Sequence, residues 1–63
     1  MTIKELRKHK GLTQIELAEK SGLNVITIQK LERGEISPYD AKYGTLIKIA
    51  KALNVSVDDL IKE

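Results

Sequence analysis

The chain has 63 residues, of which 41% are hydrophobic and 32% charged, and it contains no cysteine, tryptophan or phenylalanine. This composition predicts one small folded domain over residues 1–63, and it excludes an enzyme with two lobes, a disulfide framework and a thiolate zinc site. The formal net charge is +2. Residues 1–34 contain seven Lys/Arg and four Glu and carry +3, whereas residues 35–63 carry −1, so the positive charge lies in the first half.

The first two predicted helices each begin with a capping box. Thr2 is followed three residues later by Glu5, and Thr13 by Glu16. In this motif each side chain satisfies a free backbone N–H at the start of the helix. Gly11 supplies the end of the first helix, because glycine readily adopts the left-handed conformation that follows many helices.

The third predicted helix begins after a short turn. Gly22 ends the second helix, and Asn24 is a favourable N-cap residue for the third. Ile28 and Leu31 are three residues apart and form an apolar edge, and Gly34 closes the helix. Two helices of about eight residues joined by a turn with a glycine form a compact helical corner.

The second half of the chain predicts two further helices. Pro38 interrupts any helix that precedes it, and Asp40 is the expected cap of the fourth helix, which ends at Asn54. Ser56 and Asp59 open a short fifth helix. The fourth helix has apolar residues at i, i+3, i+4 and i+7, namely Leu46, Ile49, Ala50 and Leu53.

These patterns predict an all-α fold of five helices, because no segment alternates apolar and polar residues over the length of a strand. No apolar stretch reaches the roughly 18 residues of a membrane span, and no signal peptide is visible, so we expect a cytoplasmic protein. The expected core consists of Leu6, Leu12, Leu17, Ala18, Leu23, Ile28, Leu31, Leu46, Ile49, Ala50, Leu53, Val55, Leu60 and Ile61.

The segment LTQIELAEKSGLNVITIQKLERG, from Leu12 to Gly34, is the most informative part of the sequence. It resembles the helix-turn-helix of the phage-repressor and Cro type. The resemblance extends to Leu6-Arg7, to Pro38 and to TLIKIAKALNVSVDDLI. It implies a compact lambda-repressor-like DNA-binding domain with its helix-turn-helix at about residues 13–33.

The resemblance also implies which residues contact DNA. The third helix occupies the position of the recognition helix in the major groove, and Gln14 matches a position that touches a phosphate. Arg7 and Glu32 match an ion pair that joins the first and third helices. The positions that match the groove-facing surface are Asn24, Val25, Ile26, Thr27 and Lys30.

Val25 and Ile26 depart from the pattern, since relatives often carry polar residues at these two positions. Aliphatic groups read only the thymine methyl group, or exclude other bases by shape. One alternative is that at least one of the two packs inward. Another is that Val25, Ile26 and Ile15 form an exposed patch for a protein partner.

The segment YDAKYGTL after Pro38 is a second departure, because it is longer than the usual connection in the family. In relatives this region runs beside the DNA backbone, so Tyr39, Lys42 and Tyr43 are candidate phosphate contacts. Core packing is the favoured interpretation for Tyr43, and solvation alone is an alternative for Lys42.

The function that we expect is sequence-specific binding of double-stranded DNA by a transcriptional regulator. The resemblance implies a repressor that binds a palindromic operator as a weak homodimer, with contacts from the fifth helix and the chain end. The alternative is a protein-interaction module on the same fold, either an antitoxin or a domain that contacts a transcription component.

Enzymatic activity and a bound metal or cofactor are not expected. Glu16 and Glu19 resemble a catalytic carboxylate pair, but they lie on an exposed face and Glu16 has a capping role. Asp58 and Asp59 are first-turn acids of a helix, and His9 is a solvated cation at a helix end.

Overall fold

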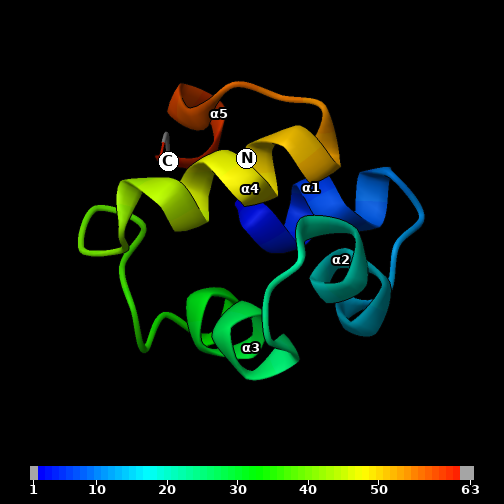
Figure 1. Cartoon of the computed structure of the whole chain (residues 1–63), viewed down its shortest axis with the longest axis horizontal. Coiled ribbons are helices and arrows are strands. Elements are labelled where there is room, and N and C mark those ends of the chain that lie inside the picture. Colours follow the sequence, from blue (N-terminus) through cyan, green and yellow to red (C-terminus); the bar gives the residue numbers. More distant parts are fainter. Residues whose placement is uncertain (1, 62–63) are drawn as a thin grey trace.

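The computed structural model describes residues 2–61, which form five helices (Figure 1). No strand occurs in this range, so the expectation of an all-α fold with five helices is confirmed. α4 lies between α5 on one side and α2 and α3 on the other, and α1 packs against α3. The helices are α1 (Ile3–His9), α2 (Gln14–Ser21), α3 (Val25–Arg33), α4 (Tyr43–Leu53) and α5 (Val57–Ile61).

Both predicted capping boxes are present. The Thr2 hydroxyl accepts a hydrogen bond of 3.1 Å from the Glu5 backbone N–H, and the Glu5 carboxylate accepts one of 3.0 Å from the Thr2 N–H. Thr13 and Glu16 make the same exchange at 3.0 and 2.9 Å. Each box satisfies two backbone N–H groups that would otherwise lack a partner at the start of a short helix.

The turn between α2 and α3 is fixed from both sides. Gly22 is the C-cap of α2 with φ of 72°, and Asn24 accepts a hydrogen bond of 2.9 Å from the Ile26 N–H. A Cβ atom at Gly22 would meet no atom within 4 Å, so its left-handed backbone, and not a lack of space, favours glycine there. The start of α3 is therefore set by local interactions.

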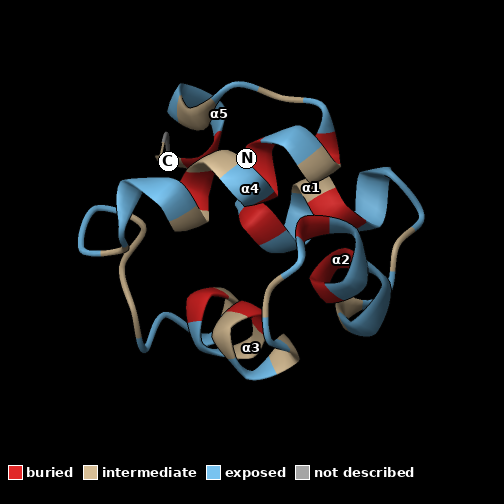
Figure 2. Cartoon of the chain, in the orientation of Figure 1, coloured by how far each residue is buried: buried red, intermediate tan, exposed pale blue. Residues whose placement is uncertain are grey.

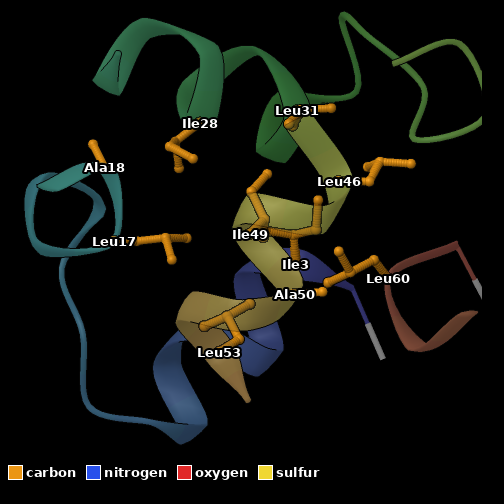
Figure 3. Close-up of a cluster of buried hydrophobic side chains, with 10 residues drawn as sticks. All are labelled: Ile3, Leu17, Ala18, Ile28, Leu31, Leu46, Ile49, Ala50, Leu53 and Leu60. Carbon is orange, nitrogen blue, oxygen red and sulfur yellow. The ribbon is translucent and has the colours of Figure 1, made fainter. Parts of the chain in front are cut away.

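The core is one cluster of aliphatic side chains contributed by all five helices (Figure 3). Ile3 is buried, with 4% of its surface exposed, although the sequence favoured Leu6 for that position. Five of the expected core residues are half-buried and pack against the cluster: Leu6, Leu12, Leu23, Val55 and Ile61. The ten buried residues are Ile3, Leu17, Ala18, Ile28, Leu31, Leu46, Ile49, Ala50, Leu53 and Leu60.

The start of α4 differs from the prediction. Asp40 does not cap this helix, because residues 37–40 form a separate turn in which the Asp40 N–H donates to the Ser37 carbonyl at 2.9 Å. The N-cap is Lys42, and its side chain makes no capping hydrogen bond. Tyr43 is 67% exposed, so the expectation that it packs in the core is wrong. The start of α4 lies at the edge of the molecule (Figure 1), and the side of its first turn that holds Leu46 is buried.

The helices in the described range are all short, with 11 residues in the longest, α4. None of them has both the length and the apolar character that a membrane-crossing helix requires.

Candidate nucleic-acid interface

α3 has one face in the core and one face in solvent (Figure 2). Ile28 is fully buried and Leu31 is 6% exposed, whereas Ile26 is 53% exposed and Lys30 and Arg33 are also exposed. Successive residues of an α-helix are about 100° apart, so positions 26, 30 and 33 lie on one side, opposite position 28. We call Ile26, Lys30 and Arg33 the outer face of α3.

The residues expected to face the groove are divided by their exposure. Asn24, Ile26 and Lys30 are exposed, whereas Val25 and Thr27 are half-buried. Val25 packs against the core, which agrees with the alternative that one residue of the apolar pair turns inward. The exposed aliphatic side chain in the first turn of α3 is therefore that of Ile26.

The proposed patch of three exposed aliphatic residues is not present as a set. Ile15 is 62% exposed, but it belongs to α2 and lies about 160° around that helix from the fully buried Leu17. Because Val25 is half-buried, Ile15 and Ile26 are the exposed members, and they lie on different helices.

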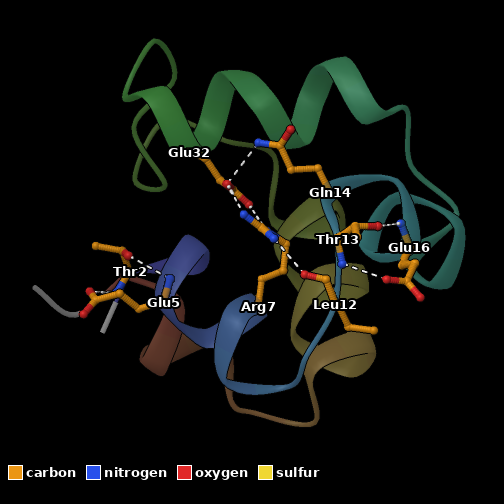
Figure 4. Close-up of polar contacts among 8 residues, drawn as sticks. All are labelled: Thr2, Glu5, Arg7, Leu12, Thr13, Gln14, Glu16 and Glu32. Carbon is orange, nitrogen blue, oxygen red and sulfur yellow. Dashed lines mark hydrogen bonds and ion pairs between the residues drawn. The ribbon is translucent and has the colours of Figure 1, made fainter.

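A buried ion pair joins α1 to the C-terminal part of α3 (Figure 4). Arg7 Nε lies 2.6 Å from Glu32 Oε2, and Arg7 Nη2 donates to Glu32 Oε1 at 3.0 Å. The third guanidinium nitrogen, Nη1, donates to the Leu12 carbonyl at 2.7 Å. The two charged side chains are only 9% and 3% exposed. This bidentate arrangement fixes α3 relative to α1 and to the segment before α2.

Gln14, the expected phosphate contact, belongs to the same network. Its side-chain Nε2 donates to Glu32 Oε1 at 3.1 Å, and the residue is half-buried (Figure 4). The first residue of α2 is thereby tied to the last turn of α3. The two residues are 18 positions apart, and nothing in their spacing indicated this hydrogen bond.

The charged groups of this network have shifted pKa values. Burial raises the pKa of Glu32. The hydrogen bonds from Arg7 and Gln14 and the charge of Arg7 together lower this pKa by more than burial raises it, so the net shift is downward. The hydrogen bond to Glu32 raises the pKa of Arg7. Both groups therefore remain charged at neutral pH, and every buried side-chain nitrogen and oxygen in the described range has a hydrogen-bond partner.

Tyr39 and Lys42 lie on the segment between α3 and α4. Both are exposed, Tyr39 to 71%. Tyr39 borders a hollow of about 590 Å³ whose wall includes Ile3, Leu31 and Leu60, from α1, α3 and α5. Tyr39 thus lies beside a mainly apolar hollow. Neither Tyr39 nor Lys42 belongs to α3, where most of the other candidate contacts lie.

Arg33 was missed as a candidate contact. It is exposed, and its guanidinium lies 3.7 Å from the Glu35 carboxylate in a surface ion pair. The signal that identifies it is the spacing of i, i+4 and i+7 from Ile26 through Lys30. The outer face therefore extends along nearly the whole of α3, from Ile26 to Arg33.

Comparison with known proteins finds similar sequences across most of the chain. A family model described as helix-turn-helix matches residues 3–60. The chain is 36% identical over 61 residues to an immunity repressor protein of Bacillus phage phi105, a match that covers 97% of this chain and 40% of the phage protein. It is 40% identical over 58 residues to an uncharacterized HTH-type transcriptional regulator of Archaeoglobus fulgidus, covering 92% of this chain and 79% of that protein.

A third relative is the HTH-type transcriptional regulator SutR of Escherichia coli, which is 40% identical over 60 residues. The match covers 95% of this chain and 32% of SutR. The chain thus spans less than half the length of SutR and of the phage repressor, and most of the length of the archaeal protein.

Proposed function

We propose, on the premise that this chain belongs to the helix-turn-helix family of the phage-repressor and Cro type, that it binds double-stranded DNA and regulates transcription. The observation that carries the proposal is the outer face of α3, which no other helix covers and which holds two cations beside Ile26. A helix of nine residues is about 14 Å long, and the major groove, about 12 Å wide, admits an α-helix. Membership of this family also confirms that the chain is not an enzyme.

The proposed contacts come from α3 and its N-cap, from the start of α2, and from the segment between α3 and α4. Asn24, Ile26 and Lys30 meet base edges or the phosphates that flank them, because they are the exposed ones among the residues expected to face the groove. Gln14 contacts a phosphate from the start of α2, since its hydrogen bond to Glu32 takes one N–H of the amide and leaves the second as a donor. Tyr39 and Lys42 would add backbone contacts at the flank, and Val25 and Thr27 would contribute by shape.

The test begins with selection of binding sites from a random library of DNA duplexes. Affinity for the selected site is then measured by fluorescence anisotropy at several salt concentrations. Lys30→Ala should change the base preference or reduce the salt slope by about 1, whereas Gln14→Ala should weaken binding to all sequences. Lys51→Ala removes an exposed lysine from α4 and is the matched control, with little expected effect.

A regulator of this kind would bind a palindromic operator as a two-fold dimer, with half-sites about one helical turn apart. The hollow beside Tyr39 supports a dimer surface that includes α5, because its lining is mainly apolar and an exposed aromatic ring borders it. The expected contribution of the chain end falls partly on residues 62 and 63, which lie outside the described residues.

Sedimentation with and without the selected duplex tests the dimer. Two copies should assemble on one palindromic site. Tyr39→Ala should reduce the self-association that is measured without the duplex, where the contact of Tyr39 with the DNA backbone plays no part. Selection of a single, non-repeated half-site bound by one copy would contradict the dimer and leave DNA binding intact.

We infer repression as the mode of regulation, since one relative is named an immunity repressor. A reporter gene with the selected site across its promoter should therefore be expressed less when this chain is present. The competing function is an interaction module for a protein partner, favoured by the exposure of Ile15 and Ile26. Undetectable binding to any duplex at low salt, together with protection of residues 24–30 by a protein, would replace the proposal with this one.

A further inference from the structure

The first turn of α3 exposes the aliphatic side chain of Ile26, and two cationic residues follow it on the same face of the helix. Ile26 is 53% exposed, and Lys30 and Arg33 follow it on the outer face at i+4 and i+7. A single exposed aliphatic residue is ordinary on a protein surface. Here, however, the aliphatic group and the two cations lie on the face of α3 that the other helices leave uncovered. This face would therefore bind a partner that presents an apolar group close to negative charges.

The neighbouring residues leave Ile26 as the main contact of this turn. Val25 is half-buried against the core. The Asn24 side-chain oxygen accepts the hydrogen bond from the Ile26 N–H at 2.9 Å, which leaves the amide NH₂ as its group for an outside partner. Asn24 thus orients the first turn, and the exposed surface there is the Ile26 side chain.

We propose that Ile26 is a specificity-determining residue that reads the 5-methyl group of a thymine in the major groove. This inference rests on the proposed function. Thymine is the base that presents a methyl group in that groove, and phosphates flank it on both sides. An aliphatic side chain gains by contact with this methyl group. The same side chain excludes water from the polar edge of any other base without replacing its hydrogen bonds, which adds discrimination against guanine and cytosine.

The test removes only the methyl group. In the selected operator each thymine is replaced in turn by deoxyuridine, which keeps the base pair and all hydrogen-bonding groups. For the unmodified chain, one position in each half-site should lose about three- to tenfold in affinity. In Ile26→Ala the same replacement should change affinity by less than about 1.5-fold, because the methyl contact is already absent.

Two controls keep the result specific to Ile26. Ile15→Ala removes the other strongly exposed isoleucine, on α2, and should retain the full difference between thymine and deoxyuridine. Ile26→Val retains a branched aliphatic group and should retain part of the difference. Thermal melts of each variant, followed by circular dichroism, establish that the folded domain is being compared.

The outcomes separate this inference from the function on which it rests. Sequence-specific binding that is insensitive to every deoxyuridine replacement would overturn the reading of thymine and leave the DNA-binding function standing. A difference that persists in Ile26→Ala would overturn the assignment to this residue. No binding to any duplex at low salt would overturn both.

Discussion

The two ends of α3 differ in how they are held. The C-terminal end carries Glu32, which is bonded to Arg7 and Gln14 and is almost fully covered. The N-terminal end has one local side-chain hydrogen bond, from the Ile26 N–H to Asn24, and exposes the Ile26 side chain. We call these the anchored end and the exposed end. The anchored end should therefore contribute chiefly to stability, whereas the exposed end is proposed to act in recognition, together with Lys30 farther along the helix. Substitutions at the two ends should act on different measurements.

The largest effect is expected from Arg7→Met, at the anchored end. The substitution leaves the Glu32 carboxylate buried without its partner and removes the donor to the Leu12 carbonyl, which should cost about 3–5 kcal/mol of unfolding free energy. Thermal and urea melts followed by circular dichroism measure the loss. Lys8→Met, an exposed lysine on the same helix, should change stability by less than about 0.5 kcal/mol.

A second substitution sharpens this prediction. Replacing both partners, in Arg7→Met with Glu32→Leu, removes the buried charge as well as the pair and should recover a large share of the lost stability. Equal melting curves for Arg7→Met and the unmodified chain would show that the anchored end does not depend on the pair.

Acid should weaken the anchored end. The pKa of Glu32 lies below the ordinary value of 4.5 because the hydrogen bonds and charge of its partners outweigh burial. The unfolded chain therefore takes up the proton first, so this contribution to stability is complete above about pH 4.5 and is lost as the pH falls through the folded-state pKa. The effect should be smaller than that of Arg7→Met, because a protonated Glu32 can still accept hydrogen bonds.

Urea melts between pH 7 and pH 3 measure this dependence. Glu32→Gln should flatten the loss below pH 4.5 without abolishing it. The remainder comes from Glu5 and Glu16, whose pKa values are lowered by the backbone N–H groups that they cap at Thr2 and Thr13. Unfolding free energy that stays constant from pH 6 to pH 3 would contradict all three assignments.

A moderate effect is expected from Asn24→Ala, at the exposed end. The change removes the acceptor of the Ile26 N–H and should cost about 1 kcal/mol, within the range for N-caps. Asn24→Ser keeps a capping oxygen and should recover most of the loss. If the alanine variant were as damaging as Arg7→Met, the contrast between the two ends would not hold.

The smallest effect on stability is expected from Ile26→Ala. Its side chain is more than half exposed, so the unfolding free energy should change by about 0.5 kcal/mol or less. Leu31→Ala, on the buried side of the same helix, should cost about 2–5 kcal/mol and is the matched comparison. Similar melting temperatures for these two variants would contradict the assignment of the two faces.

Most of the fold could be predicted because its signals are local. The capping boxes at Thr2 and Thr13 depend on residues three positions apart, and the Asn24 cap spans two, so the sequence alone contains both partners. The left-handed caps at Gly22 and Asn54 are properties of single residues. These helix boundaries therefore followed from short-range chemistry, whereas the start of α4, at Lys42, has no side-chain cap and was predicted wrongly.

What the sequence could not determine depends on contacts between distant segments. Ile3 and Leu6 are both apolar and three apart, and only the packing of the other helices decides that Ile3 is the more buried. Tyr43 lies three residues before Leu46, on a favourable side of α4, yet the fold ends before covering it. The hydrogen bond from Gln14 to Glu32 joins two helices and has no signature in spacing.

The placement of the aromatic rings has a consequence for spectroscopy. Tyr39 and Tyr43 are the chain's two aromatic residues, and both are mostly exposed. Unfolding of the aliphatic core therefore changes the surroundings of neither ring greatly, and intrinsic fluorescence should respond weakly to denaturation. The same two rings lie within five residues of each other on one surface segment. The fluorescence of the two tyrosines should therefore respond to a partner that binds this segment, and it should change little when the core unfolds.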